Sequence, residues 1–138
     1  MEESAVVLML KEADTGFLTK EMGCYSVAGN MDLLFQIFVQ EDAQMPMVHM
    51  GLTCAKELED WEYDAVFDYY DTEVFQGLVD SITEEDGHLN PVWVLTFAWI
   101  DEPIQMAEKL SEILAVHEQE LCSVYEAIAD KKDDYIEK

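Results

Sequence analysis

The chain has 138 residues, half of them hydrophobic, and a formal net charge of −24 at pH 7. Its 31 Asp and Glu residues face only 7 lysines, and the sequence contains no arginine. So few cations cannot form the basic patch needed to bind nucleic acid or an anionic membrane, and the composition favours a basic protein or peptide as partner. The hydrophobic content is sufficient for a core, so residues 1–138 are expected to fold as a single α+β domain.

The first 56 residues are predicted to form four strands. Apolar, β-branched or alternating residues cover the ranges 4–11, 17–27, 32–40 and 47–56. Within the third strand, period-two alternation is expected to place on one face Leu33, Phe35, Ile37 and Val39. Because the turns between these strands are short, strands that are neighbours in sequence are expected to pair as an antiparallel meander.

Residues 58–71 fit either a strand or a helix. Strand alternation would group Trp61, Tyr63, Ala65, Phe67 and Tyr69. Helical spacing instead separates an apolar stripe from an acidic one, and Asp60 and Glu62 suit the first turn of a helix. We favour the helix, because Asp and Glu are poor strand residues.

The last part of the chain is predicted to form a hairpin and a long helix. The hairpin comprises residues 73–83 and 91–100, and Pro103 occupies a position typical of a helix start. The apolar stripe of this helix is predicted to contain Ala107, Leu110, Leu114, His117, Leu121, Val124 and Ile128. Lys131 and Lys132 would lie at its C-terminus, and its length would be on the order of 40 Å.

The order ββββ-α-ββ-α predicts a six-stranded, mainly antiparallel sheet with both helices on one face. Residues 92–100 carry large apolar side chains on one side and smaller apolar ones on the other, so the face without helices would expose apolar residues. Such a patch indicates an interface, and a homodimer through the sheet or through the long helix is expected. A terminus or a loop could instead cover this face.

None of the short motifs in the chain predicts a catalytic residue, a metal site or a cofactor. Asp14-Thr15-Gly16 matches the aspartic-protease triplet, but it occurs once and between two strands, where a turn explains it. The Met45–Met50 segment, with His49, could bind Cu(I), but methionine is also a common packing residue. The chain contains no phosphate-binding glycine loop and no nucleophile or zinc motif.

The remaining histidines and cysteines leave an enzyme or metal-binding protein as the alternative hypothesis. His88 follows three acids in a predicted turn, which could attract a cation or simply be solvated. His117 is expected in the core or at an interface. Cys24, Cys54 and Cys122 show no disulfide or zinc spacing, so a reducing, cytoplasmic location is expected, and a Cys–His pair would have to be assembled by the fold.

The strongest functional signal is an acidic, aromatic-rich stretch. Between Glu57 and Glu108 there are fifteen carboxylates and no lysine or arginine. The residues predicted to bind a partner are Glu57, Asp60, Trp61, Asp64, Asp68, Tyr70 and Asp71. Carboxylates beside exposed aromatic rings suit a basic, partly apolar protein surface. The alternatives are a solvated helix whose aromatic residues are all core, or acidity that serves solubility or salt adaptation.

We therefore predict a non-enzymatic, acidic binding or adaptor protein that engages a basic partner. It could be chaperone-like or act as a nucleic-acid mimic. Size, acidity and strand–helix order resemble those of small dimeric secretion chaperones, although this chain lacks their initial helix.

Overall fold

The computed structural model describes residues 3–12, 14–42 and 45–136. Its strands are β1 (Glu3–Lys11), β2 (Leu18–Ala28), β3 (Leu34–Asp42), β4 (Met45–Leu52), β5 (Ser81–Glu85) and β6 (Val92–Ala98). Its helices are α1 (Asp60–Tyr69), α2 (Pro103–Ile128) and α3 (Lys132–Tyr135), with short 3-10 helices η1 (Met31–Leu33) and η2 (Thr72–Phe75). The predicted α+β class and the order of the main elements are confirmed.

The six strands form one mixed sheet in the order β2-β1-β3-β4-β6-β5. The predicted meander is wrong at one point: β3 lies beside β1 and not beside β2, and it runs parallel to β1 with Leu10 opposite Val39. The other neighbouring strands are antiparallel. The segment through η1 leads from the edge strand β2 across the end of the β1–β2 hairpin to β3. The short length of the connections does not by itself predict this crossing.

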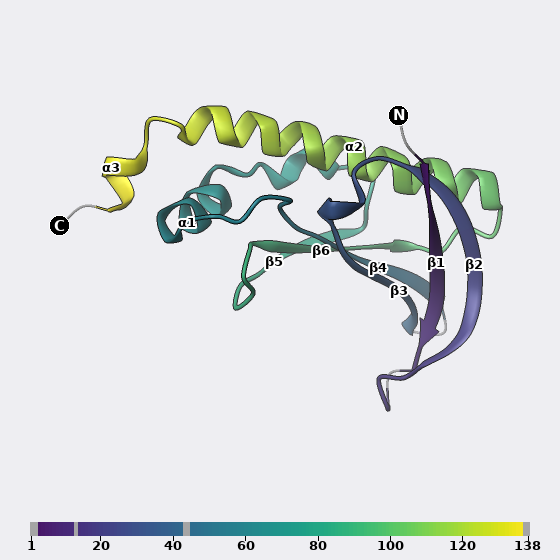
Figure 1. Ribbon diagram of the computed structural model, residues 1–138. Helices are drawn as coiled ribbons and strands as arrows, with labels where there is room; N and C mark the ends of the chain where they lie inside the picture. Colours follow the sequence, from purple (N-terminus) through teal and green to yellow (C-terminus); the bar gives the residue numbers. More distant parts are fainter. Residues whose placement is uncertain (1–2, 13, 43–44, 137–138) are drawn as a thin grey trace.

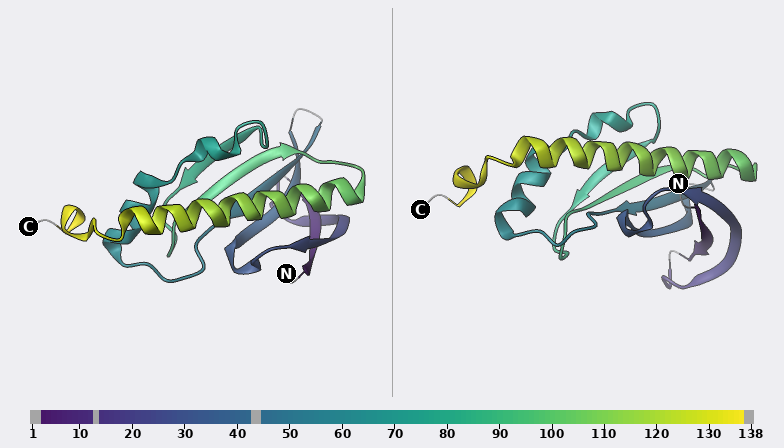
Figure 2. Two further views of the ribbon diagram at one scale, coloured as in Figure 1. Left: turned by 90° about the horizontal axis from the view of Figure 1, so that it is seen from above. Right: turned by 45° about the horizontal axis from the view of Figure 1, so that its top comes forward.

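The long helix α2 lies along one face of the sheet, and α1 lies on the same side (Figures 1 and 2). The apolar stripe predicted for α2 is confirmed except at Ala107, which is half-buried, and it also includes Met106 and Ile113, which were not predicted. The buried residues of α2 are Met106, Leu110, Ile113, Leu114, His117, Leu121, Val124 and Ile128. They pack on core-facing strand residues such as Val48, Met50, Trp93 and Leu95. None of the helices in the described part of the chain combines the length and hydrophobicity needed to cross a membrane.

The helix predicted near residues 58–71 is confirmed as α1. Glu59 is its N-cap, and a capping box links Glu59 and Glu62, each side chain accepting a backbone N–H of the other residue. Ala65 and Val66 are its buried residues. Phe67 meets the Trp93 ring edge-on with centroids 5.4 Å apart, which fixes this helix against the sheet.

Three element boundaries differ from the prediction. The strand expected over residues 73–83 is wrong in its first half, because η2 and a turn at Gly77, whose φ is 83°, precede β5. The strand expected to reach residue 56 ends at Leu52. The long helix ends at Ile128, so Lys131 and Lys132 belong to the start of α3 and do not lie at its C-terminus.

A register shift in β3 places one of its side chains on a different face of the sheet from the one predicted. The pairing with β4 is irregular between Leu34 and Gln36. Phe35 consequently leaves the core face, is 43% exposed and contacts the His88 ring at a centroid distance of 4.9 Å. A bulge adds a residue to one strand and reorients the side chains beside it, and nothing in the local alternation reveals it.

Candidate functional site

The predicted acidic residues form a stripe on the solvent side of α1. Asp60, Asp64 and Asp68 are spaced four residues apart and are all exposed, while the opposite side of the helix is buried. Glu57 is exposed in the segment that leads into this helix. The structure therefore brings three of the predicted carboxylates, Asp60, Asp64 and Asp68, to one surface.

The lysines near this stripe are engaged with other acids. Lys56 Nζ lies 3.6 Å from Glu62, and Lys132 Nζ lies 3.9 Å from Glu59. No lysine among the described residues forms an ion pair with the three aspartates of the stripe. Like charges four residues apart on a helix repel one another, and no lysine of the described residues offsets this repulsion by pairing with the stripe.

Hydrogen bonds join α1 to the elements around it. The Tyr135 hydroxyl of α3 donates to Asp68 Oδ2 at 2.8 Å. The Asp71 carboxylate caps η2 by accepting the Glu73 N–H at 3.0 Å, and the Asp71 N–H donates to Glu120 of α2 at 2.9 Å. Figure 1 shows α1, α3 and the C-terminal half of α2 gathered at one end of the molecule. We call this region, with η2, the acidic end.

The two predicted aromatic residues differ in their accessibility. Trp61 is half-buried, with its ring 6.3 Å from that of Tyr135. Tyr70 is 6% exposed and stacks on Trp93, so the structure corrects its predicted place on a partner-binding surface. Tyr70 follows the last helical residue of α1, where the chain turns inward, and the exposed aromatic residue is its neighbour Tyr69.

A groove between η2 and α2 adjoins the acidic end and was not predicted. Its volume is about 360 Å³, and its lining residues are Val74, Val116, Gln119, Glu120 and Ser123. Val74 is 38% exposed there. One sequence feature points to the groove, because the apolar Val74 directly follows the acidic stretch that ends at Glu73. The prediction of a strand over residues 73–83 concealed it. The groove adds the apolar side chains of Val74 and Val116 to the acidic end.

His117 belongs to a buried polar network and not to a site open to solvent. Its Nε2 lies 2.7 Å from the Thr53 carbonyl oxygen, which can only accept, so Nε2 carries the hydrogen. Its Nδ1 then accepts the Tyr70 hydroxyl hydrogen at 2.7 Å. Burial lowers the pKa of His117 to about 4, and burial also raises the pKa of the Tyr70 hydroxyl. Both groups are therefore neutral at pH 7.

Cys54, His49 and His88 contact aromatic or acidic side chains. Burial raises the pKa of the Cys54 thiol to about 11, and this thiol hydrogen-bonds Tyr125. His49 stacks on Phe38 with centroids 5.0 Å apart, and His88 Nε2 lies 2.8 Å from Glu85. No three Asp, Glu, His or Cys side chains within the described ranges are grouped closely enough to hold a metal ion.

The Asp14–Gly16 segment lies between β1 and β2, in the turn that was predicted there. Gly16 has a φ of 77°, and its N–H donates to the Glu12 carbonyl at 2.7 Å. Such a positive φ favours glycine in a tight turn. These contacts account for the Asp14–Gly16 motif as a turn, with no catalytic role needed. Ala13 lies outside the described residues.

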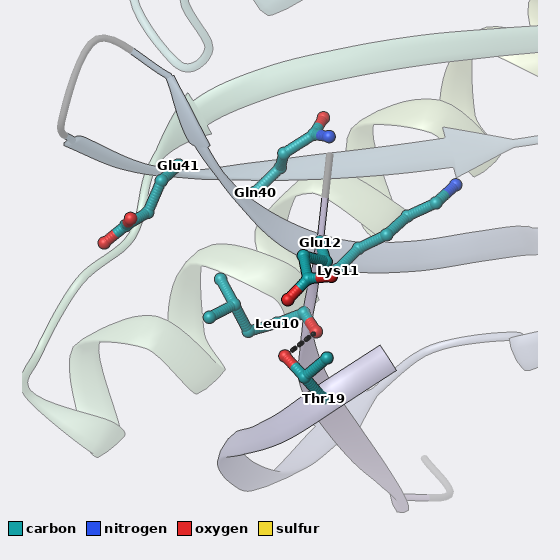
Figure 3. A pocket seen from close by; sticks show the side chains of 6 residues that line it. All are labelled: Leu10, Lys11, Glu12, Thr19, Gln40 and Glu41. Atoms are coloured by element: carbon teal, nitrogen blue, oxygen red, sulfur yellow. Dashed lines mark hydrogen bonds between the residues drawn. The ribbon is translucent and has the colours of Figure 1, made fainter. Parts of the chain in front are cut away.

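A second pocket, of about 280 Å³, opens where β1 and β3 separate. Figure 3 shows its lining residues, Leu10, Lys11, Glu12, Thr19, Gln40 and Glu41. The Thr19 hydroxyl donates to the Leu10 carbonyl at 3.3 Å, and the Lys11 side chain extends away from this bond (Figure 3). Its mixed charges do not match the predicted partner chemistry, and none of its residues was predicted to be functional.

Comparisons with curated proteins and with solved structures find no match. A family model does match, and it covers residues 1–136. The chain therefore belongs to a family of unknown function, DUF6762.

Proposed function

We propose that the protein is a non-enzymatic binding or adaptor protein whose acidic end captures a basic protein segment. The observation that carries the proposal is the stripe of Asp60, Asp64 and Asp68, with which no lysine of the described residues forms an ion pair. These carboxylates repel one another, and a cationic partner would relieve that repulsion. The compartment proposed is the cytoplasm, which suits three free cysteines.

Each part of the acidic end has a separate role in this binding. The carboxylates attract Lys and Arg side chains over a distance of about one Debye length, roughly 8 Å at physiological salt. The groove beside Val74 receives an apolar side chain, and the exposed ring of Tyr69 offers a cation–π contact. Charge thus sets the rate of encounter, and the groove sets the geometry of the complex.

The groove favours an adaptor or chaperone-like role over nucleic-acid mimicry. The apolar side chains that line the groove, Val74 and Val116, have no counterpart in a phosphate backbone. A basic amphipathic helix, with cations on one side and an apolar anchor on the other, matches both features.

Binding of a labelled basic amphipathic peptide, followed by fluorescence anisotropy, tests the proposal. The variant D60N/D64N/D68N/D71N should weaken binding at least tenfold, because each asparagine removes a charge but can still accept the hydrogen bonds made by Asp68 and Asp71. Raising the salt concentration should weaken the wild type more steeply than the variant.

The control variant removes the same four charges far from the acidic end. It is E21Q/E41Q/D101N/E108Q, which changes exposed residues of β2, of β3, of the loop before α2 and of the first half of α2. It should bind the peptide within about twofold of the wild type, because Glu108, the changed residue on α2, lies eight residues, or about 12 Å of helix rise, before Val116 of the groove. Equal losses in the two variants would show that the protein attracts cations only through its net charge, and would refute the proposed site.

A further inference from the structure

The short helix α3 contacts the side of α1 that carries two of the residues predicted to bind a partner (Figure 1). Trp61 and Asp68 are seven residues apart, just under two helical turns, so they lie nearly in line on α1. The centroid of the Tyr135 ring lies 6.3 Å from that of Trp61, and the Tyr135 hydroxyl donates to Asp68 Oδ2 at 2.8 Å. At the start of α1, Lys132 Nζ lies 3.9 Å from Glu59. Helix α3 therefore occupies part of the acidic end.

The groups that α3 presents to α1 are those that a basic, partly apolar partner would bring. Tyr135 supplies an aromatic ring and a hydrogen-bond donor, and Lys132 supplies an ammonium group. Cations and an aromatic or apolar anchor are also what the carboxylates and rings of α1 attract from another chain. Because Tyr135 already holds Asp68 and lies against Trp61, a partner that uses these two side chains must first displace it.

Few interactions hold α3 in place. It has four residues, none of them buried, and the next residue, Ile136, is 51% exposed. A helix of about one turn is not stable alone in water, so α3 depends on its contacts with α1. The ion pair of Lys132 is exposed, and exposed ion pairs contribute little to stability. The buried stripe of α2 ends at Ile128, before α3 begins, so detachment of α3 leaves that stripe in place.

We propose that α3 is an internal competitor of the basic partner, docked on α1 in the free protein and displaced when the partner binds. This inference rests on the proposed function and adds a regulation of the same site. In the described part of the chain, the hydrogen bond and ion pair of α3 with α1 use neither Asp60 nor Asp64, so these two carboxylates can attract the partner first. Release of Tyr135 then frees Asp68 and the Trp61 ring. The apparent Kd rises in inverse proportion to the fraction of chains in which α3 is undocked.

Binding of the basic peptide to variants of the whole chain, followed by fluorescence anisotropy, tests the competition. K132Q/Y135A removes the ammonium group, the ring and the hydroxyl that dock α3. It should lower the Kd about tenfold, the gain expected if α3 is docked in about nine chains of ten. Y135F removes only the hydrogen bond to Asp68 and should lower the Kd by about threefold. If α3 served only to support α1, both variants would bind the peptide more weakly, which would overturn the inference.

A matched control removes the same charge from α3 and its surroundings without removing a docking contact. It is K131Q/I136A, because Lys131 pairs with its neighbour Asp130 at 3.4 Å and Ile136 is exposed. This control should bind the peptide within about twofold of the wild type, since it alters only long-range attraction. An equal gain in the control and in K132Q/Y135A would show that loss of a positive charge raises the affinity, and would refute competition by α3.

NMR of the wild-type chain follows α3 directly. On saturation with the peptide, residues 132–135 should lose the Cα chemical shifts of a helix, because a released single turn does not stay folded. Helical shifts that persist in the saturated complex would overturn the inference. An unchanged Kd in K132Q/Y135A, with the peptide still bound at the α1 stripe, would refute the role of α3 and leave the proposed function standing. Failure of both the wild type and this variant to bind would refute the proposed function, and the inference with it.

Discussion

At the scale of single residues, the most constrained group is His117. It is fully buried, yet both ring nitrogens have partners, the Thr53 carbonyl and the Tyr70 hydroxyl. The Trp93 indole lies against both rings, with centroids 5.4 Å from His117 and 4.2 Å from Tyr70. This network joins α2 to the end of α1 and to the segment after β4. It stabilises the base of the acidic end without contacting a partner.

His117 makes stability depend on pH. Its pKa falls from 6.5 to about 4 on folding, so the unfolded chain binds this proton more tightly. Its stabilising effect is complete above pH 6.5 and is lost as the pH falls toward 4, by about 3 kcal/mol in total. Urea unfolding between pH 7 and pH 4.5 should show a smaller loss in His117→Met than in the wild type. Carboxylate protonation affects both proteins alike, so equal losses would contradict this account.

At the scale of elements, period and capping predicted most of the fold. The 3.6-residue stripe of α2, and the acids at the start of α1, identified both helices from local sequence. The parallel β1–β3 pair and the bulge that exposes Phe35 escaped prediction, because both depend on pairing between distant segments. The candidate site was predicted in part. Helical spacing identified the stripe, but the burial of Tyr70 and the presence of the groove depend on how η2 packs on α2.

Removing negative charge from the α1 stripe should raise the stability of the protein and weaken its binding of a basic partner. Asp64→Lys replaces two repulsions, with Asp60 and with Asp68, by two attractions at i,i+4 spacing. The free energy of unfolding should rise by about 0.5–1 kcal/mol, as urea denaturation would measure. The same variant should bind the basic peptide more weakly. A variant that is neither more stable nor weaker in binding would show that the stripe is screened by solvent and has no role.

At the scale of the whole molecule, acidic side chains gather on the helical side. The exposed acids of α1 and η2, and those near the end of α2, belong to elements on that side. Added salt should therefore weaken the capture of a basic segment, because it screens the attraction between opposite charges.

The central claim is that the acidic end is the binding surface, and amide chemical-shift mapping with the basic peptide tests it most directly. The account predicts shifts concentrated in residues 57–74 and 116–135, saturating at one peptide per chain. The D60N/D64N/D68N/D71N variant should lose these shifts, and the E21Q/E41Q/D101N/E108Q variant should keep them. Shifts centred on the sheet, or spread evenly over every acidic surface, would contradict it.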